Sequence, residues 1–322
     1  VTGKVSFGDT ENVLAVRVDN SGNYQESTTG TNFQWNSRGM YPNYGGLVGH
    51  IWLHVPGKIY QTYPLYNNLK TSGIYIYGTN YTNINAQGTK GDLTVNVEAE
   101  VSNESGCAQG AVLGVKVNDA TTGHTVATFQ GTAASLAATG ATKLTASGPL
   151  TGANLWSDIQ PTLYNVVTTV SVGGKEVNAR TTLTGFRKVE FRGGVGTGGV
   201  YINGRFVYLL GFAQCATNEW AALGMATPDW MHDYTANMVR GANSNYIRWM
   251  HVTPQRIDAQ SFDKYGVVHV APAGDRESDA SGVQWTQRVN VMRASMIYLR
   301  NNPSVLFWEV LRASRAVRSP WN

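Results

Sequence analysis

The pattern of apolar residues changes once along this 322-residue chain, near residue 190. Before that point, short runs alternate apolar and polar residues, and Gly, Pro and Asn separate the runs. After it, strand-like runs alternate with stretches of helical periodicity. Strands bury every second residue and helices every third or fourth, so the change predicts two kinds of folding unit in one chain.

The first part is predicted to be antiparallel β-structure. Residues 93–101 form the clearest strand, because Leu93, Val95 and Val97 alternate with polar residues. We expect a Gly-, Ala- and Thr-rich loop up to residue 150 and further strands at residues 12–20, 49–55, 73–78, 111–117, 125–129, 163–172 and 176–183. Strands at this spacing predict a sandwich from about residue 90 to 190.

The second part is predicted to be α/β structure with parallel strands. A hairpin is expected around Asn203-Gly204. Thr227-Pro228-Asp229 is expected to open a helix that runs to about Gly241, with Thr227 as its cap and Pro228 at its first position. Two more helices are expected, and strands ending near residues 212, 250, 271 and 310. Four such strands are about half of the eight that a closed (β/α)8 barrel requires.

Composition excludes several functions. Lys and Arg are dispersed and the net charge is only +4, which does not favour nucleic-acid binding. No apolar run approaches the roughly 20 residues of a membrane span. The histidines are scattered and the cysteines are Cys107 and Cys215, so we expect no metal site and no cofactor. No leader follows Val1, so a signal peptide is absent or already removed, and the compartment stays open.

Several stretches in order resemble family 2 glycoside hydrolases of the β-galactosidase type. They are residues 12–20 (Asn-Val-Leu-Ala-Val-Arg-Val-Asp-Asn), 40–48, 155–157, 161–166, 185–190, 201–207, 245–251 and 302–308 (Asn-Pro-Ser-Val-Leu-Phe-Trp). The resemblance implies a multidomain chain: a partial jelly-roll sugar-binding domain over residues 1–88, an immunoglobulin-like sandwich over 89–190 and the first half of a TIM barrel over 191–310. Residues 311–322 match nothing in the family.

The chain also departs from the family pattern. The Asn-Glu pair that carries the family's acid/base falls on Arg312 and Ala313, and the region of the nucleophile is absent. Ala271 and the three residues after it replace an acidic position. The magnesium ligands of some members are altered as well, so the resemblance implies no metal here.

Glycoside hydrolysis needs two carboxyls, about 5–5.5 Å apart for retention or about 6.5–9.5 Å for inversion. We single out Glu309, on the last strand in phase with Val305 and Phe307, and Glu219, in the loop after the first barrel strand. Each has a structural alternative: Glu309 as the ion-pair partner of an arginine such as Arg248, and Glu219 as a solvated loop carboxylate.

Further candidates could contact a sugar. Arg248 and His251 correspond to positions that line the family's sugar pocket, Asn218 could bond a hydroxyl or cap a turn, and Trp220 and Trp249 could stack on a sugar ring or belong to the core.

Three hypotheses remain open: a glycosidase with impaired or non-standard catalysis, a carbohydrate-binding fragment, and an inactive truncation product. In each case an open half-barrel exposes a sheet edge, so we expect a homo-oligomer that covers it.

Overall fold

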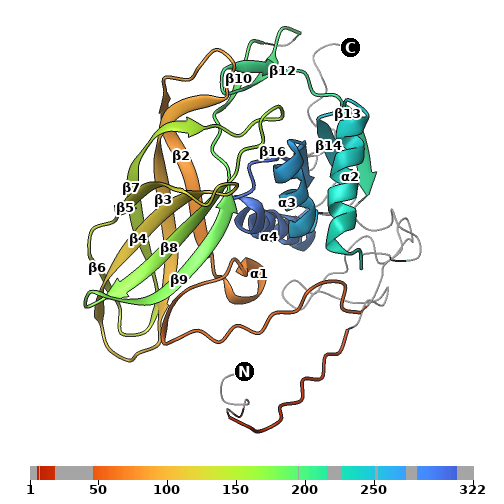
Figure 1. The fold of residues 1–322 in the computed structure, drawn as a ribbon. Helices are drawn as coiled ribbons and strands as arrows, with labels where there is room; N and C mark the ends of the chain where they lie inside the picture. Colours follow the sequence, from red (N-terminus) through yellow and green to blue (C-terminus); the bar gives the residue numbers. More distant parts are fainter. Residues whose placement is uncertain are drawn as a thin grey trace.

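The computed structural model describes residue 6 and residues 8–18, 46–194, 196–215, 223, 226–250, 253–272 and 281–309. Figure 1 shows a β-sandwich on one side of the molecule and a smaller sheet with its helices on the other. None of the helices in these ranges is long and apolar enough to cross a membrane.

One sheet of the sandwich is built around β3 (Lys90–Asn103). Its whole length pairs with β7 (Gly140–Asn154), and its other edge pairs with β2 (Ile74–Thr82) and β1 (Ile59–Gln61). The second sheet has the order β5-β4-β8-β9, and β6 also pairs with β4. Its strands are β4 (Gln109–Asp119), β5 (Thr125–Gln130), β6 (Ala134–Leu136), β8 (Tyr164–Val172) and β9 (Lys175–Thr184).

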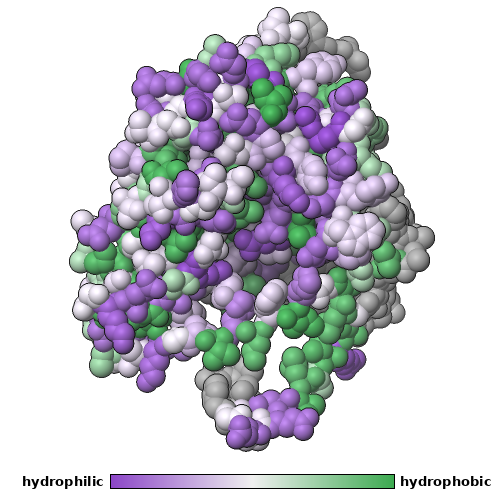
Figure 2. All heavy atoms as spheres, viewed as in Figure 1, coloured by the Kyte–Doolittle hydropathy of each residue, from purple (hydrophilic) through white to green (hydrophobic). Residues whose placement is uncertain are grey.

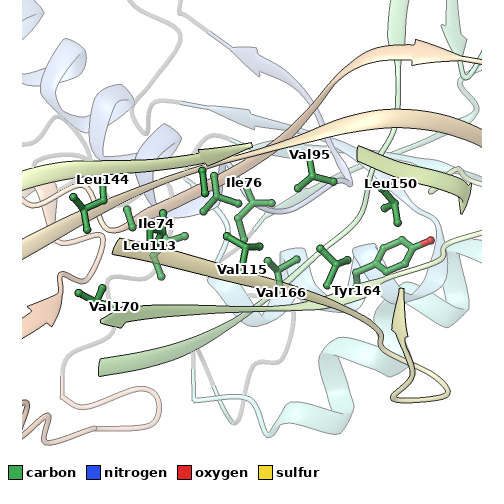
Figure 3. Packing of buried hydrophobic residues seen from close by; sticks show 14 of the residues in the cluster. Ile74, Ile76, Val95, Leu113, Val115, Leu144, Leu150, Tyr164, Val166 and Val170 are labelled. Carbon is green, nitrogen blue, oxygen red and sulfur yellow. The ribbon is translucent and has the colours of Figure 1, made fainter. Parts of the chain in front are cut away.

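The apolar core lies between these two sheets, as Figure 3 shows. Val95 and Leu150 come from the first sheet, and Val115 and Val166 come from the second. All four side chains are at most 3% exposed. Burial of one such side chain contributes roughly 1.5–3 kcal/mol, so this core holds the sheets together. The sandwich predicted from alternation is therefore confirmed.

One sequence expectation in this region is wrong. The loop expected before residue 150 is largely the 15-residue strand β7. Small residues disguise its alternation, and Gly148 is required there because a Cβ would lie 2.4 Å from Cγ of Phe129. Strand β2, which comes before residue 88, pairs with β3 and lies in the same sheet of the sandwich.

The strands expected at residues 12–20 and 49–55 are not seen in the described residues. Residues 11–18 and 50–57 run as extended segments outside any sheet. Figure 2 shows apolar side chains along these segments. Leu14 and Leu53 are 77% and 75% exposed. Alternation alone does not make a strand when no partner strand lies beside it. Residues 19–45, with most of the other jelly-roll stretch, lie outside the described residues.

A small antiparallel sheet leads into the second unit. It consists of β10 (Val189–Arg192), β11 (Gly199–Ile202) and β12 (Arg205–Val207). The predicted hairpin at Asn203-Gly204 is confirmed, with φ values of +52° and +81°. These are the left-handed conformations that a type I′ turn requires.

Four parallel strands in the order β13-β14-β15-β16 form the second unit. They are β13 (Gly211–Cys215), β14 (Tyr246–Met250), β15 (Val268–Pro272) and β16 (Val305–Glu309). The connecting helices are α2 (Asp229–Gly241), α3 (Arg256–Tyr265) and α4 (Gly282–Leu299), while the short α1 (Tyr66–Leu69) lies between β1 and β2 of the sandwich in the sequence. The N-cap of α2 is Pro228 and not Thr227, because the Thr227 hydroxyl bonds to His232 instead.

Buried polar contacts join the two units. The wholly buried Trp156, from the end of the sandwich, donates its indole N–H to the backbone carbonyl of Asp263 in α3 at 2.8 Å. The Asp263 carboxylate accepts from the backbone N–H of Ser304 at 2.9 Å, from the Ser304 hydroxyl at 2.6 Å and from the side-chain amide of Asn302 at 2.6 Å. Burial raises the pKa of Asp263 to about 6, although these donors lower it. The joint therefore fixes α3, β16 and the sandwich together.

Asp263→Ala is predicted to destabilise the protein by at least about 3 kcal/mol. The substitution leaves the Asn302 side-chain amide and the Ser304 backbone amide without an acceptor, and each unpaired buried donor costs about 1–3 kcal/mol. The Ser304 hydroxyl can still donate to the carbonyl of Ala259. Lys264→Ala is the control, because the Lys264 side chain is largely exposed and its ion pair with Asp233 is expected to contribute under about 1 kcal/mol. Urea unfolding measures both, and equal losses would contradict the assignment.

Candidate functional site

The two faces of the parallel sheet have different roles. Ile247 and Trp249 of β14 point toward α2 and α3 and are buried with Phe262. Tyr246 and Arg248 alternate with them and therefore lie on the opposite face, which the helices leave uncovered. We call this opposite face the inner face. It is the face on which polar side chains near the strand ends can meet a ligand.

A bulge in β16 decides which of its residues reach the inner face. The register is His269 to Val305 and then Val270 to Phe307, so Leu306 is the extra residue. Val305 packs with Leu299 of α4 on the helix face, whereas Phe307 packs with Tyr246. Glu309 and Phe307 lie on the same face of the sheet, as expected. Val305 was expected on that face too, but the bulge places it on the helix face.

Glu309 and Arg248 form an ion pair on the inner face. Their side chains are 22% and 29% exposed. Burial raises the pKa of the neighbouring Tyr246; the charge of Arg248 acts to lower it and that of Glu309 to raise it. Of the two interpretations of Glu309 from the sequence, the structure shows the ion pair with Arg248. A carboxylate held in this way can bind a sugar hydroxyl and stabilise positive charge.

Oε2 of Glu309 makes no hydrogen bond within the described part of the chain, although it is buried. One oxygen of the carboxylate is thus held by Arg248 and the other has no partner there. Buried polar atoms are normally paired, so an unpaired oxygen at the end of a strand is a point where a ligand donor can bind.

Trp249 belongs to the core and does not line the inner face. It is 1% exposed, its ring stacks on Phe262 with centroids 5.4 Å apart, and its indole N–H donates to Nδ1 of His269 at 3.1 Å. Burial lowers the pKa of His269 to about 3, so this histidine stays neutral and accepts the bond. The proposed sugar contact of Trp249 is therefore replaced by a packing role.

The remaining sequence candidates lie outside the described residues. These are Asn218, Glu219, Trp220 and His251, together with Arg312 and Ala313. Tyr246 also belongs to the inner face, although it was not among the residues expected there; its alternation with Ile247 could have indicated it. Phe307 lies there with Glu309, as expected, and only the opposite position of Val305 required knowledge of the bulge.

A second polar cluster joins the first turns of α2 and α3. Nδ1 of His232 bonds to a carboxylate oxygen of Asp258 at 2.5 Å, and Nε2 bonds to the Thr227 hydroxyl at 2.8 Å. Burial lowers the pKa of His232, but the hydrogen bond and the charge of Asp258 outweigh burial and raise it overall. Asp258 also accepts from the backbone N–H of Gln255, so the cluster connects the first turns of both helices.

Within the described ranges, no group of three or more His, Cys, Asp or Glu side chains could hold a metal ion.

Residues 75–187 match the family model of glycosyl hydrolases family 2. A β-glucuronidase of Formosa agariphila is 31% identical over 311 residues, which are 96% of this chain and 30% of that protein. The chain thus spans about a third of the length of this relative.

Solved structures show the same similarity. A β-glucuronidase from glycoside hydrolase family 2 superimposes with a TM-score of 0.68 at 30% identity, over 78% of this chain and 25% of that chain. A β-glucuronidase of Bacteroides uniformis gives a TM-score of 0.65 at 19% identity, over 78% of this chain and 28% of that chain. The second match shows likeness of fold alone.

The His232 contact predicts a pH-dependent contribution to stability. Because its folded-state pKa is raised, the contribution is fully present below the unfolded value of about 6.5 and is lost as pH rises through the folded value. The difference in unfolding free energy between wild type and His232→Gln should therefore be largest at acid pH and shrink toward alkaline pH. His54→Gln, at an exposed site, is the control. A difference that does not change with pH would contradict the prediction.

Proposed function

Because this chain belongs to glycosyl hydrolase family 2, we propose that it acts on O-glycosidic bonds of carbohydrates. β-Glucuronides are the first substrate class to test, since relatives at 30% and 31% identity are β-glucuronidases. β-Galactosides, which the sequence resemblance favours, are the second. The observation that carries the proposal is the ion pair of Arg248 with Glu309, the last residue of the parallel strand β16.

The parallel-sheet unit is proposed to be the first half of a (β/α)8 barrel. Its support is the sequential strand order, with helices on one face and the polar pair on the other. In such barrels the strands' carboxyl ends carry the active site. Glu309 is the last residue of β16, and Arg248, in the middle of β14, reaches it across β15 on the inner face. The carboxyl end of β16 is the expected place for a residue that binds the sugar.

Glu309 is proposed as the carboxylate that takes part in catalysis, and Arg248 as its partner and a sugar contact. Arg248 holds one oxygen of Glu309, and Oε2 has no partner within the described residues, so the carboxylate can still contact a sugar. Glu219 is proposed as the second carboxylate, and Asn218, Trp220 and His251 as further contacts. These roles rest on their positions in the sequence.

Catalysis is proposed to be impaired. The position that resembles the family's acid/base holds Ala313, and a methyl group cannot donate a proton to the leaving group. General acid catalysis contributes about 10²–10⁴-fold to rate, so turnover should be lower than in the relatives by about this factor.

Hydrolysis of p-nitrophenyl β-D-glucuronide and p-nitrophenyl β-D-galactoside by the purified chain tests the proposal. We expect slow release of nitrophenol from the glucuronide, and a further fall of about 10²-fold or more in kcat for Glu309→Gln. Glu190→Gln is the matched control, because this exposed-strand glutamate pairs with Arg192 and lies away from the inner face.

Equal rates for wild type and Glu309→Gln would remove Glu309 from catalysis. Calorimetry with methyl β-D-glucuronide then separates the alternatives. Binding that Arg248→Gln weakens but Arg293→Gln, at an exposed site of α4, leaves unchanged would indicate a carbohydrate-binding fragment. Absence of both binding and turnover would indicate an inactive product.

Self-association is proposed to cover the open edge of the parallel sheet. Among the described strands, β13 pairs with β14 alone, so its other edge has unpaired backbone groups. A groove of about 330 Å³ lies beside it, lined by Phe212, Met238, Val239 and Ile247 among others. Phe212 is 52% exposed. A second copy that covers this edge would bury both features.

Light scattering after size-exclusion chromatography tests this idea. Wild type is expected to elute as a dimer or larger species, and Phe212→Lys should shift it toward monomer, because a charge in the apolar groove opposes burial. Phe206→Lys is the control, since Phe206 of β12 is equally exposed at 52% and lies outside the groove. A wild-type monomer would contradict the proposal.

A further inference from the structure

A pocket of about 300 Å³ lies between α1 and α4, apart from the inner face. The segment around α1 contributes Pro64, Leu65 and Tyr66, and α4 contributes Val291, Ser295 and Tyr298. Small-molecule sites in proteins begin at about this volume and combine apolar walls with a few polar groups. The pocket therefore has the size and the kind of lining that a small ligand requires.

The α4 wall of the pocket follows from helical spacing. Val291, Ala294, Ser295 and Tyr298 are three or four residues apart and share one side of the helix. Leu299, on the neighbouring side, is wholly buried against Val305 of the parallel sheet. The packing of α4 on the sheet thus separates this pocket from Arg248 and Glu309, which lie on the opposite face.

Two tyrosine rings in the lining are held in place by cations. The Lys70 ammonium lies 5.2 Å from the ring centroid of Tyr66, and the Arg256 guanidinium lies 6.0 Å from that of Tyr298. Neither cation belongs to the lining. Rings that are already fixed lose little freedom when a ligand packs on them, so this arrangement favours binding.

Ser295 gives the pocket an unsatisfied polar group. The residue is 4% exposed, and its hydroxyl oxygen has no hydrogen-bond partner within the described residues. A buried hydroxyl without a partner costs about 1–3 kcal/mol, and a ligand hydroxyl that reaches it removes this cost. The pocket therefore favours an occupant that can both donate and accept hydrogen bonds.

The chemistry of the lining narrows the occupant. None of the lining residues is charged, and the polar groups are the hydroxyls of Thr253, Ser295 and the tyrosines and the amides of Asn67 and Asn68. A neutral pyranose matches this set, because it has an apolar face of C–H groups for the tyrosine rings and hydroxyls around its rim for the amides. A charged sugar would lose hydration without gaining a counter-ion.

We propose that this pocket is a non-catalytic binding site for a neutral pyranoside. It goes beyond the function proposed for the inner face, because its residues, its polarity and its position are different. The inner face has a charged pair and is proposed to bind a glucuronide, whereas this pocket discriminates against charge.

Calorimetry with methyl β-D-glucopyranoside and methyl β-D-glucuronide tests the proposal on the full chain. Wild type is expected to bind the neutral glycoside in the millimolar range, as a few hydrogen bonds and one ring contact imply. Ser295→Ala should weaken this binding by about 5–10-fold through loss of a hydrogen bond, and Ala294→Phe should abolish it by filling the pocket. Arg248→Gln should leave it unchanged.

Circular dichroism checks that each variant is folded. If Ala294→Phe does not fold, Tyr298→Ala, on the exposed side of the pocket, is a second variant that should bind the neutral glycoside more weakly. Neutral-glycoside binding that Arg248→Gln removes and Ala294→Phe retains would place the sugar on the inner face and overturn the proposal. Equal affinity for the glucuronide would overturn its neutrality. Binding of phenol without binding of the methyl glycoside would identify an aromatic site instead.

Discussion

The joint at Trp156 and Asp263 is the contact on which the relation between the two units depends. The Trp156 side chain, from the sandwich, donates to the backbone carbonyl of Asp263 in α3. The Asp263 carboxylate in turn accepts from Ser304 and Asn302, which lie just before β16. Arg187, next to Trp156, donates to the carbonyl of Val305. Burial lowers the pKa of this arginine to about 10, yet it remains charged at neutral pH. Strand β16, which ends in Glu309, is therefore positioned by the sandwich as well as by its own sheet.

Much of this fold follows from local sequence. The parallel strands and the helices between them were expected within a few residues of their observed bounds, because period and capping residues are local signals. The hairpin at Asn203-Gly204 could also be predicted, since few other dipeptides adopt two successive left-handed conformations. Strand β7 could not be predicted from local sequence. Its residues are mostly small, and what makes them a strand is the length of β3 beside them, which is a tertiary contact.

The candidate site could be predicted from the sequence only in part. Glu309 and Arg248 could be named from the sequence, and their pairing was one of two open alternatives. The core position of Trp249 follows from its alternation with Arg248, but only once the helix-covered face is known. Tryptophan has both the apolar surface of a core residue and the ring of a sugar contact, so its type alone does not decide between them. The neighbours of such a residue decide its role.

The extra residue in β16 has a consequence for how sequences of this kind are aligned. In an unbroken strand, Trp308 would face inward and Glu309 would face the helices, so the carboxylate and the indole would exchange places. One residue of slippage therefore separates a chain that offers an acid to the interior from a chain that offers an aromatic ring. An alignment that inserts or removes a gap at Leu306 changes that assignment without altering any residue that it compares.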